Sequence, residues 1–317
     1  MNFRTKISIE KAAVEVSYAS RILMLGSCFT DNIGKKLQQA KFKVAINPFG
    51  IQYNPLSVAQ ALQYLVEKKQ FGTSDLFLHQ DRWHSFMHHS SFSASTPDAT
   101  LTEINSRLFL AAASLPKTDI VFISFGTAWV YTLKDNGAVV SNCHKLPDSL
   151  FIRRRLTVDE IVSAFVPLLQ KVESINPNIQ VVFTVSPIRH WKDGPHENNL
   201  SKSILLLAIE ALQKTMKTVS YFPAYELLLD DLRDYRFYTE DMMHPNSTAI
   251  AYIWEKFGDS YFTGSTKELV GEMEKLTKME LHRPFNTESE AYEMFCAQME
   301  QKKAAIKKRF VEFDFEF

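Results

Sequence analysis

Two short segments far apart in the chain carry side chains that could perform nucleophilic catalysis together. In the first, Ser27 follows a glycine directly after an apolar run, where a helix is expected to begin. In the second, Asp241 and His244 lie three residues apart. That spacing lets the carboxylate bind the Nδ1–H of the imidazole and leaves Nε2 as a general base. Together the three side chains predict the triad of a serine hydrolase, with Ser27 as nucleophile.

The neighbouring residues support this prediction when both segments are taken together. Gly26 permits a tight turn at a strand end, and the N–H groups at the start of the following helix favour a negatively charged oxyanion. Pro245 restrains His244 to extended backbone, and Asn246 suits the cap of the next helix. Taken alone, Ser27 fits a helix N-cap better than a nucleophile. The pair of segments is more specific than either one.

Five short apolar runs would position these segments in a parallel sheet. They span residues 22–25, 42–46, 120–124, 179–185 and 219–222, and they are continuously apolar, which is typical of strands covered on both faces. Helical patterns lie between them at 31–40, 56–69, 157–174 and 199–217, the third with a capping box of Thr157 and Glu160. This alternation predicts an α/β fold with a doubly wound sheet. The ligand site of such a sheet lies on the loops after the carboxyl ends of the strands.

Two regions fall outside this alternation. Residues 70–118 are rich in His, Ser, Phe and Asp and show no clear strand, so we expect an insertion that packs over the site or beside it. From residue 263 the pattern is charged and helical, with capping-box spacings at Ser265–Glu268 and Thr287–Glu290. We therefore expect a hydrolase domain over 1–262 and a helical extension over 263–317 packed on it, with the ending, 310–317, as a strand or a docked arm. A separately folded tail is the less favoured alternative.

The bulk composition argues against several classes of protein. The 317 residues include 36 basic and 36 acidic ones, so no global basic field exists to attract nucleic acid. The basic groups at 153–155 and 302–309 are interpreted as solvated faces. Three dispersed cysteines without C-x-x-C spacing argue against a disulfide framework or a structural zinc. A polar N-terminus and the absence of a bilayer-length apolar run predict a cytoplasmic protein with no membrane partner, and we expect no cofactor.

Several stretches of the chain resemble a known family. The Gly26-Ser27 turn and the D-x-x-H-P pattern at 241–245 are similar to the first and last blocks of the SGNH, or GDSL-like, hydrolases. The chain more closely resembles the GSCFA branch, whose name-giving block is similar to residues 26–29, with Thr30 where Ala is usual. Further stretches that resemble this branch are NPFG at 47–50, YNP at 53–55, FGTAWVY at 125–131 and SPIRH at 186–190. The likeness covers roughly residues 3 to 260.

The resemblance implies a fold and a set of roles. The fold would be a three-layer α/β/α sandwich with a flavodoxin-like sheet of about five strands. The reaction would be hydrolysis of an ester, often acetyl, on a carbohydrate or other small molecule. Ser27 would attack the carbonyl, His244 would take its proton and return it to the leaving alcohol, and Asp241 would orient His244. The N–H groups of Ser27 and Gly50 would bind the oxyanion, although Gly50 fits an ordinary turn glycine equally well.

One position departs from the wider SGNH pattern. That pattern has an Asn in the third block, near Gly126, whose side chain donates to the oxyanion, and Ala128 stands where this Asn is expected. Losing one such donor typically lowers the rate by about two to three powers of ten. Either Thr127, Asn54 or backbone N–H groups substitute for it, or the hydrolase is slow, specialised or inactive.

Four histidines gather in the segment 79–89. Their spacing fits no common ligand pattern, so we predict no metal and favour pocket lining or a plain surface loop. Within this segment, His84 and Ser85 are predicted to contact substrate. Cys28, beside the predicted nucleophile, is expected to pack beneath the turn, with a thiolate at the helix N-terminus as the alternative.

Asn54 and three further side chains are predicted to contact substrate. Arg189 and His190 follow the fourth strand and would either bind a carboxylate or phosphate of the substrate or fix their loop with Asp193. Trp129, together with Tyr131, would offer an aromatic platform to a sugar, although core packing fits these two rings better.

Three functions stay open at this point. The leading one is an esterase, and a close relative is an acyltransferase in which a sugar hydroxyl replaces water. The third is a catalytically silent binding module, which the missing Asn favours and the intact triad opposes. Nucleotide binding ranks low because the chain has neither G-x-G-x-x-G nor G-x-x-x-x-G-K-[ST], and it also lacks the G-x-S-x-G of α/β-hydrolases. The sequence makes no prediction of oligomeric state.

Overall fold

The computed structural model describes residues 5–283, 285–286 and 288–311. At its centre is a parallel sheet with the strand order β10-β9-β5-β1-β2. Its strands are β1 (Arg21–Gly26), β2 (Lys43–Ile46), β5 (Ile120–Phe125), β9 (Gln180–Val185) and β10 (Val219–Tyr221). Counted along the chain, these five strands have the 2-1-3-4-5 order of a flavodoxin-like sheet, which confirms the predicted fold class.

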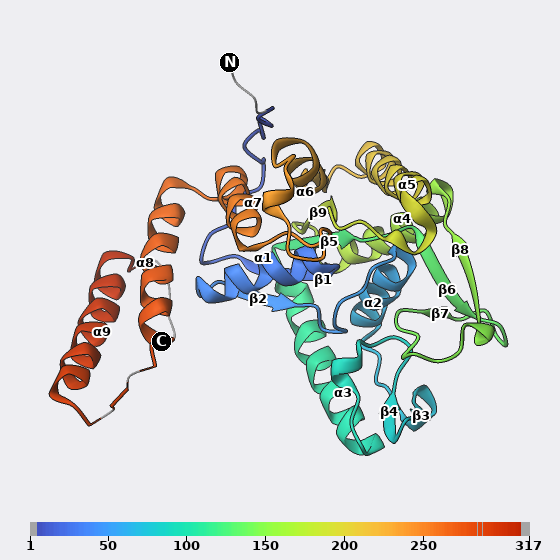
Figure 1. Ribbon diagram of the computed structural model, residues 1–317, viewed down its shortest axis with the longest axis horizontal. Helices are drawn as coiled ribbons and strands as arrows, with labels where there is room; N and C mark the ends of the chain where they lie inside the picture. The colour runs from blue at the N-terminus through green and yellow to red at the C-terminus, as the bar shows by residue number, and fades with distance from the viewer. Residues whose placement is uncertain (1–4, 284, 287, 312–317) are drawn as a thin grey trace.

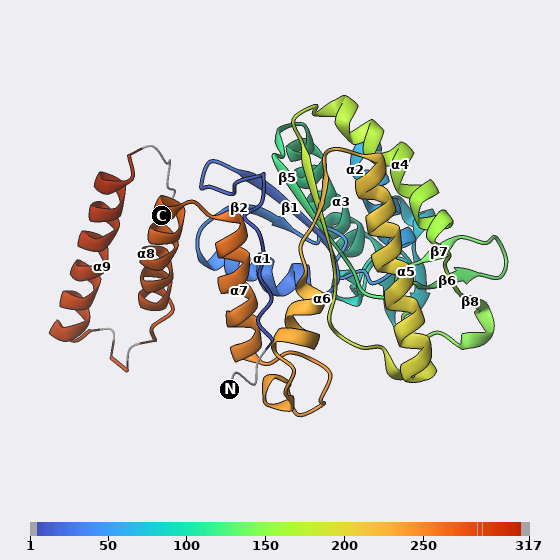
Figure 2. The same ribbon diagram turned by 90° about the horizontal axis from the view of Figure 1, so that it is seen from above.

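Helices cover both faces of the sheet and complete the three layers (Figures 1 and 2). Helices α2 to α5 pack on one face, and α1, α6 and α7 pack on the other. Their bounds are α1 (Cys28–Gln39), α2 (Pro55–Glu67), α3 (Pro97–Ser114), α4 (Val158–Ile175), α5 (Gly194–Thr215), α6 (Ala224–Glu226) and α7 (Ser247–Tyr261). Alternate residues of β1 enter the two cores, Leu23 on the α2 side and Met24 on the α1 side. Burial on both faces explains why these strands are apolar throughout.

The predicted strands and the helices between them are confirmed to within a few residues. The difference that matters is at α1, which begins at Cys28 rather than at residue 31. Ser27 is its N-cap, and the Ser27 hydroxyl accepts a hydrogen bond from the N–H of Phe29 at 3.4 Å. The predicted capping box of Thr157 and Glu160 is present in α4. The early start of α1 places Cys28 in its first turn.

The segment 70–118 differs from the expected strand-free insertion. It contains a hairpin of β3 (Phe77–His79) and β4 (Arg82–His84), followed by the long helix α3. Ile104 and Leu108 of α3 belong to the main core, whereas Phe109 and Leu110 are exposed. Because apolar residues lie on both the buried and the exposed side of α3, its sequence lacks the one-sided period that predicts a helix.

A second sheet, which the sequence did not predict, follows β5. It is antiparallel, has the order β7-β6-β8, and consists of β6 (Trp129–Leu133), β7 (Val139–Val140) and β8 (Phe151–Arg155). All three arginines of β8 form ion pairs with acidic residues of later segments: Arg153 with Asp193, Arg154 with Glu160 and Arg155 with Glu197. The interpretation of 153–155 as a solvated face therefore fits Arg154, whose side chain is 44% exposed, but is wrong for Arg153, whose side chain is only 21% exposed.

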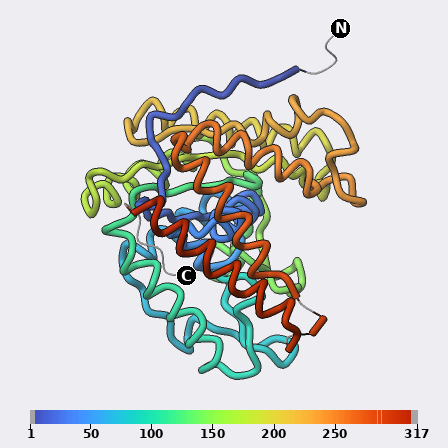
Figure 3. Tube along the Cα trace, turned by 90° about the vertical axis from the view of Figure 1, so that its left-hand side faces the viewer, coloured from blue at the N-terminus to red at the C-terminus, as the bar shows by residue number. Residues whose placement is uncertain are grey.

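The C-terminal helices α8 (Gly264–Glu280) and α9 (Glu290–Arg309) form a hairpin on the α1 side, with α9 outermost (Figures 2 and 3). Leu269 and Met273 of α8 and Ile306 of α9 belong to the same core as α1 and α7. An ion pair of 2.6 Å joins Lys41 to Glu280. Helices α8 and α9 therefore contribute to the core on the α1 side, whereas the division into a domain over 1–262 and an extension over 263–317 stays a prediction.

The caps of the tail helices differ from the predicted ones. Thr263 caps α8, and Ser289 caps α9. Thr287 and residues 312–317, and with them most of the predicted strand or arm, lie outside the described residues. Within the described ranges, no helix combines the length and apolarity needed to cross a bilayer.

Candidate active site

A cleft of about 820 Å³ opens at the carboxyl ends of the central strands. Cys28 after β1, Thr127 after β5 and Ile188 after β9 contribute to its lining, and His244 lines it from the loop before α7. Strands β1 and β5 are neighbours in the sheet, and between them the strand order reverses. The cleft therefore lies where open α/β sheets bind their ligands.

Asp241 and His244 form a hydrogen-bonded pair at this cleft, as predicted from their spacing. Nδ1 of His244 lies 2.5 Å from Oδ2 of Asp241, while Oδ1 accepts the N–H groups of His244 and Met243 at 2.9 Å each. These hydrogen bonds, the one from the N–H of His244 first, hold the pKa of Asp241 well below its ordinary value. Asp241 is thus a carboxylate at neutral pH, fixed against one side of the imidazole, and no hydrogen bond from the described residues engages Nε2.

Ser27 lies apart from this pair. Its side chain is 1% exposed, and its Oγ lies 2.7 Å from the Oγ of Ser124 at the end of β5. It does not line the cleft, and within the described part of the chain no hydrogen bond joins it to His244. The structure therefore brings Asp241 and His244 together but leaves Ser27 outside their contact.

Cys28 occupies the position expected of Ser27. Its side chain is half-buried and lines the cleft, so the prediction that it packs beneath the turn is wrong. Burial raises the pKa of Cys28, and the neighbouring Tyr53 hydroxyl lowers that pKa to a smaller extent. The two adjacent side chains point to different sides because Cys28 is the first residue of α1 and Ser27 is its cap.

The close approach of two strands explains the glycine of this turn. Gly26 has φ of +126°, and a Cβ on it would lie 2.1 Å from the carbonyl oxygen of Ser124. Only glycine fits such a backbone without displacing β5. Gly26 thus lets Ser124 contact the turn directly.

The N–H groups expected to bind an oxyanion are already engaged. The N–H of Ser27 donates to Ser124 O at 3.1 Å, and that of Gly50 donates to Asn47 O at 2.7 Å. Gly50 has φ of +78°, and a Cβ there would come within 2.3 Å of the Cβ of His89. In this structure neither N–H is free for an oxyanion, so both assignments are corrected, and the turn-glycine alternative fits Gly50.

Thr127 and Asn54 line the cleft, as the sequence suggested, and each also holds its own segment. Oγ1 of Thr127 accepts the N–H of Trp129 at 3.2 Å, and Oδ1 of Asn54 caps α2 through the N–H of Ser57 at 2.8 Å. Ala128 is fully buried in the core. Of these two neighbours Thr127, and not Ala128, faces the cleft, and the oxyanion role of Thr127 stays a prediction.

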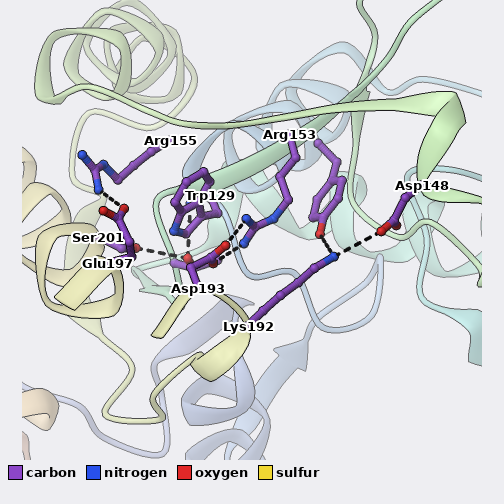
Figure 4. Close-up of polar contacts among 10 residues, drawn as sticks. Trp129, Asp148, Arg153, Arg155, Lys192, Asp193, Glu197 and Ser201 are labelled. Carbon is purple, nitrogen blue, oxygen red and sulfur yellow. Dashed lines mark hydrogen bonds and ion pairs between the residues drawn. The ribbon is translucent and has the colours of Figure 1, made fainter. Parts of the chain in front are cut away.

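One wall of the cleft is a layer of aromatic rings and ion pairs (Figure 4). The Arg153 guanidinium lies 4.2 Å from the ring centroid of Trp129 and pairs with Asp193. Nζ of Lys192 lies 3.0 Å from the Tyr131 hydroxyl. Trp129 lines the cleft, as predicted. Asp193 binds Arg153, so it does not fix the loop through Arg189, as one alternative had it.

Arg189 and His190 line the cleft as predicted. Burial lowers the pKa of His190 to about 4, so this imidazole is neutral at pH 7. Its ring meets the ring of Tyr53 edge-on at 5.8 Å. The Arg189 guanidinium lies 5.9 Å from the Trp191 ring and has no carboxylate partner among the described residues. An unpaired cation at a cleft wall favours a ligand with negative charge.

His84 and Ser85 do not line the cleft, so their predicted substrate contacts are wrong. Both are buried: Nδ1 of His84 lies 2.6 Å from Oγ of Ser93, and Oγ of Ser85 lies 2.9 Å from Nδ1 of His88. These hydrogen bonds stabilise the β3–β4 region from inside. His89 is the histidine of this segment that reaches the cleft. Among the described residues, no cluster of His, Cys, Asp or Glu is suited to hold a metal.

Sequence reasoning missed Lys202, which is buried beneath the cleft loops. Its Nζ donates to the carbonyls of Gly126 and Ser186 at 2.6 Å each, and so joins the ends of β5 and β9. Burial lowers its pKa to about 7. The one signal in the sequence was a lysine on the apolar face of α5, in line with Leu205 and Ile209, whose side chains are also buried.

Comparisons with known proteins agree with the resemblance seen in the motifs. Residues 21–257 match the GSCFA family, and residues 273–317 match the "GSCFA domain protein, C-terminal domain". No curated protein matches the chain.

Two solved structures are similar to the chain at low identity. An acetyl xylan esterase, Est2A, from the rumen bacterium Butyrivibrio proteoclasticus is 12% identical with a TM-score of 0.38, over 77% of this chain and 64% of that one. A carbohydrate esterase family 3 protein from Talaromyces cellulolyticus is 11% identical with a TM-score of 0.36, over 80% of this chain and 99% of that one. The chain thus spans slightly less than two thirds of the first of these proteins.

Proposed function

The chain belongs to the GSCFA family, and from this premise we propose that it is an SGNH-type esterase that removes an acyl group, such as acetyl, from a carbohydrate or other small molecule. The observation that carries the proposal is the pair of Asp241 and His244 at the rim of a cleft of about 820 Å³. A carboxylate that fixes Nδ1–H leaves Nε2 as the base that acyl transfer requires.

The proposed reaction uses His244 twice. Nε2 takes the proton of the nucleophile as it attacks the ester carbonyl, and then returns that proton to the leaving alcohol. The Asp241 carboxylate stabilises the imidazolium in between. In the serine-triad form of the proposal the nucleophile is Ser27, which must then exchange its contact with Ser124 for one with His244. Water completes the cycle, and an acceptor hydroxyl in place of water would make the enzyme an acyltransferase.

The charge of the cleft favours an acyl compound with a negative group. Four of its lining side chains are cations, and Asp148 is the one acidic residue among those lining it. Arg153 and Lys192 have carboxylate partners, whereas Arg189 and Lys145 have none among the described residues. A carboxylate or phosphate on the substrate would lie well beside Arg189.

The proposal is tested with purified protein, Asp241→Asn and the control Asp234→Asn. Asp234 is an exposed carboxylate of the preceding turn that pairs with Arg236. On p-nitrophenyl acetate and acetylated sugars, we expect Asp241→Asn to lower kcat/KM by about 10² to 10³ and the control to change it little. Activity equal in all three proteins would contradict the proposal.

The substrate panel sharpens the test. It pairs neutral acetylated sugars with acetylated uronates, and we expect the uronates to react faster, with a preference that shrinks as salt is raised from about 0.05 M to 0.5 M. Transfer of acetyl to an added sugar in preference to water would select the acyltransferase form.

A further inference from the structure

The turn after β1 presents two nucleophilic side chains to two different environments. The Ser27 hydroxyl is buried against β5, 2.7 Å from Ser124 Oγ, and also caps α1. The Cys28 thiol lines the same cleft as His244, Tyr53 and His190. Only an atom exposed to the cleft can reach the carbonyl of a substrate bound there.

We propose that Cys28, and not Ser27, is the nucleophile of this site, so that the acyl-enzyme is a thioester. This inference rests on the proposed acyl-transfer function and identifies the group that performs it. Three observations support it. Cys28 lies in the cleft wall, and the Asp241–His244 pair faces the same cleft. The Ser27 hydroxyl is already hydrogen-bonded to Ser124.

The surroundings of Cys28 suit a thiol that reacts with the help of a base. Burial raises the pKa of Cys28, so the resting group is S–H and does not attack unaided. The neighbouring Tyr53 hydroxyl favours the thiolate as it forms. Cys28 is also the first residue of α1, and the helix dipole and the first-turn N–H groups other than those of Phe29 and Asp31 favour negative charge on the sulfur and on the oxyanion. These N–H groups replace the engaged ones of Ser27 and Gly50.

Each step of the reaction balances with water as the second reactant. As the Cys28 Sγ–C bond forms, the thiol proton passes to Nε2 of His244 and the carbonyl oxygen becomes the oxyanion. The C–O bond to the alcohol then breaks, and the alcohol oxygen takes the proton from His244. Water next attacks the thioester and gives a proton to His244, the C–S bond breaks, and the sulfur takes that proton back.

Ser27 has a structural role that the proposal leaves intact. Its hydroxyl joins β1 to β5 through Ser124 and caps α1 through the N–H of Phe29. Reaching the cleft would cost both hydrogen bonds and would leave the Ser124 hydroxyl, itself fully buried, without this partner.

Four variants of the full chain separate the two nucleophiles. We expect Cys28→Ala to lower kcat/KM on p-nitrophenyl acetate by at least about 10³, and Cys28→Ser, which keeps the size of the side chain, by about 10 to 10³. Ser27→Ala should lower it only slightly more than Ser124→Ala, because both variants remove the hydrogen bond between the two hydroxyls and Ser27→Ala also removes the cap of α1. A larger loss in Ser27→Ala than in Cys28→Ala and Cys28→Ser would overturn the inference while leaving the proposed esterase intact.

The chemistry of the trapped acyl group gives an independent readout. Acid-quenched enzyme should carry acetyl on the peptide that contains Cys28, and neutral hydroxylamine should remove it, because hydroxylamine cleaves thioesters far faster than oxygen esters. Acetyl on Ser27 that resists hydroxylamine would overturn the inference.

Alkylation tests the thiol without any substrate. Cys143 is a matched internal control, because it is also half-buried in the cleft wall. We expect iodoacetamide to modify Cys28 at least about ten times faster than Cys143, and we expect His244→Ala to abolish the difference. Equal rates in the wild type would overturn the inference even if no ester is hydrolysed, whereas failure of the esterase proposal would appear as inactivity with this difference intact.

Discussion

The turn at residues 26–29 and the loop at 239–246 face the same cleft but are built in opposite ways. The turn is fixed by the sheet, since the backbone and hydroxyl of Ser124 contact Gly26 and Ser27. The loop fixes itself, because Asp241 binds the N–H groups and the imidazole of its own segment while both side chains stay half exposed. A base can therefore be built locally, whereas the choice of nucleophile depends on contacts across the whole sheet.

The largest expected effect comes from the self-contained loop. His244→Ala should lower kcat/KM by about three to four powers of ten, because it removes the base while touching little else. The thermal midpoint should not change, since His244 is half exposed. Added imidazole should restore part of the rate through the open cleft. A fall in the thermal midpoint would show that the loop is built into the fold like the turn.

The turn should respond in the opposite way. Gly26→Ala places a Cβ against Ser124 O, and we expect the free energy of unfolding to fall by about 4 kcal/mol or more, with activity lost alongside. Gly137→Ala is the matched control, because Gly137 also has a positive φ, +71°, but no atom lies within 4 Å of the added Cβ. That control should cost about 1–2 kcal/mol. If urea denaturation showed the same loss of unfolding free energy in both variants, backbone strain rather than contact with β5 would explain why the turn requires glycine.

A smaller effect extends the comparison to the buried histidines beside the cleft. Burial lowers the pKa of His88 to about 3 and that of His144 to about 4. The unfolded chain binds protons at these sites below about pH 6.5 and the folded chain does not, so their stabilising effect is complete above pH 6.5 and is lost as the pH falls toward 4. His88 alone should contribute a slope of about 1.4 kcal/mol per pH unit.

Urea denaturation between pH 7 and 4.5, on wild type and His88→Phe, measures this slope. Phenylalanine suits the site because the imidazole stacks on Phe49 at 4.9 Å and meets Phe71 at 4.8 Å. Carboxylates titrate in both proteins, so the difference between the two curves isolates His88. Parallel curves would show that His88 is charged in the folded protein.

Local patterns predicted much of this structure, and tertiary contacts explain what they missed. The five strands follow from continuous apolar runs, and the Asp241–His244 pair follows from its spacing. The start of α1 was predicted three residues too late. Because a helix turns about 100° per residue, the late start led to a wrong prediction of which side chain faces the cleft. Arg153 and Asp193 form an ion pair although they lie 40 residues apart in the chain, and no local pattern in either segment predicts it. The exposed apolar residues of α3 concealed its helical period.

The contacts of Ser124 have a consequence for how this sequence can change over evolutionary time. Its carbonyl oxygen excludes any side chain at Gly26, and its hydroxyl shares a hydrogen bond with Ser27. A mutation at one of the three positions therefore alters what selection permits at the other two. In any set of natural relatives, residues 26, 27 and 124 should therefore change together rather than singly, whereas selection on Cys28 should follow the reaction and not the contacts of Ser124.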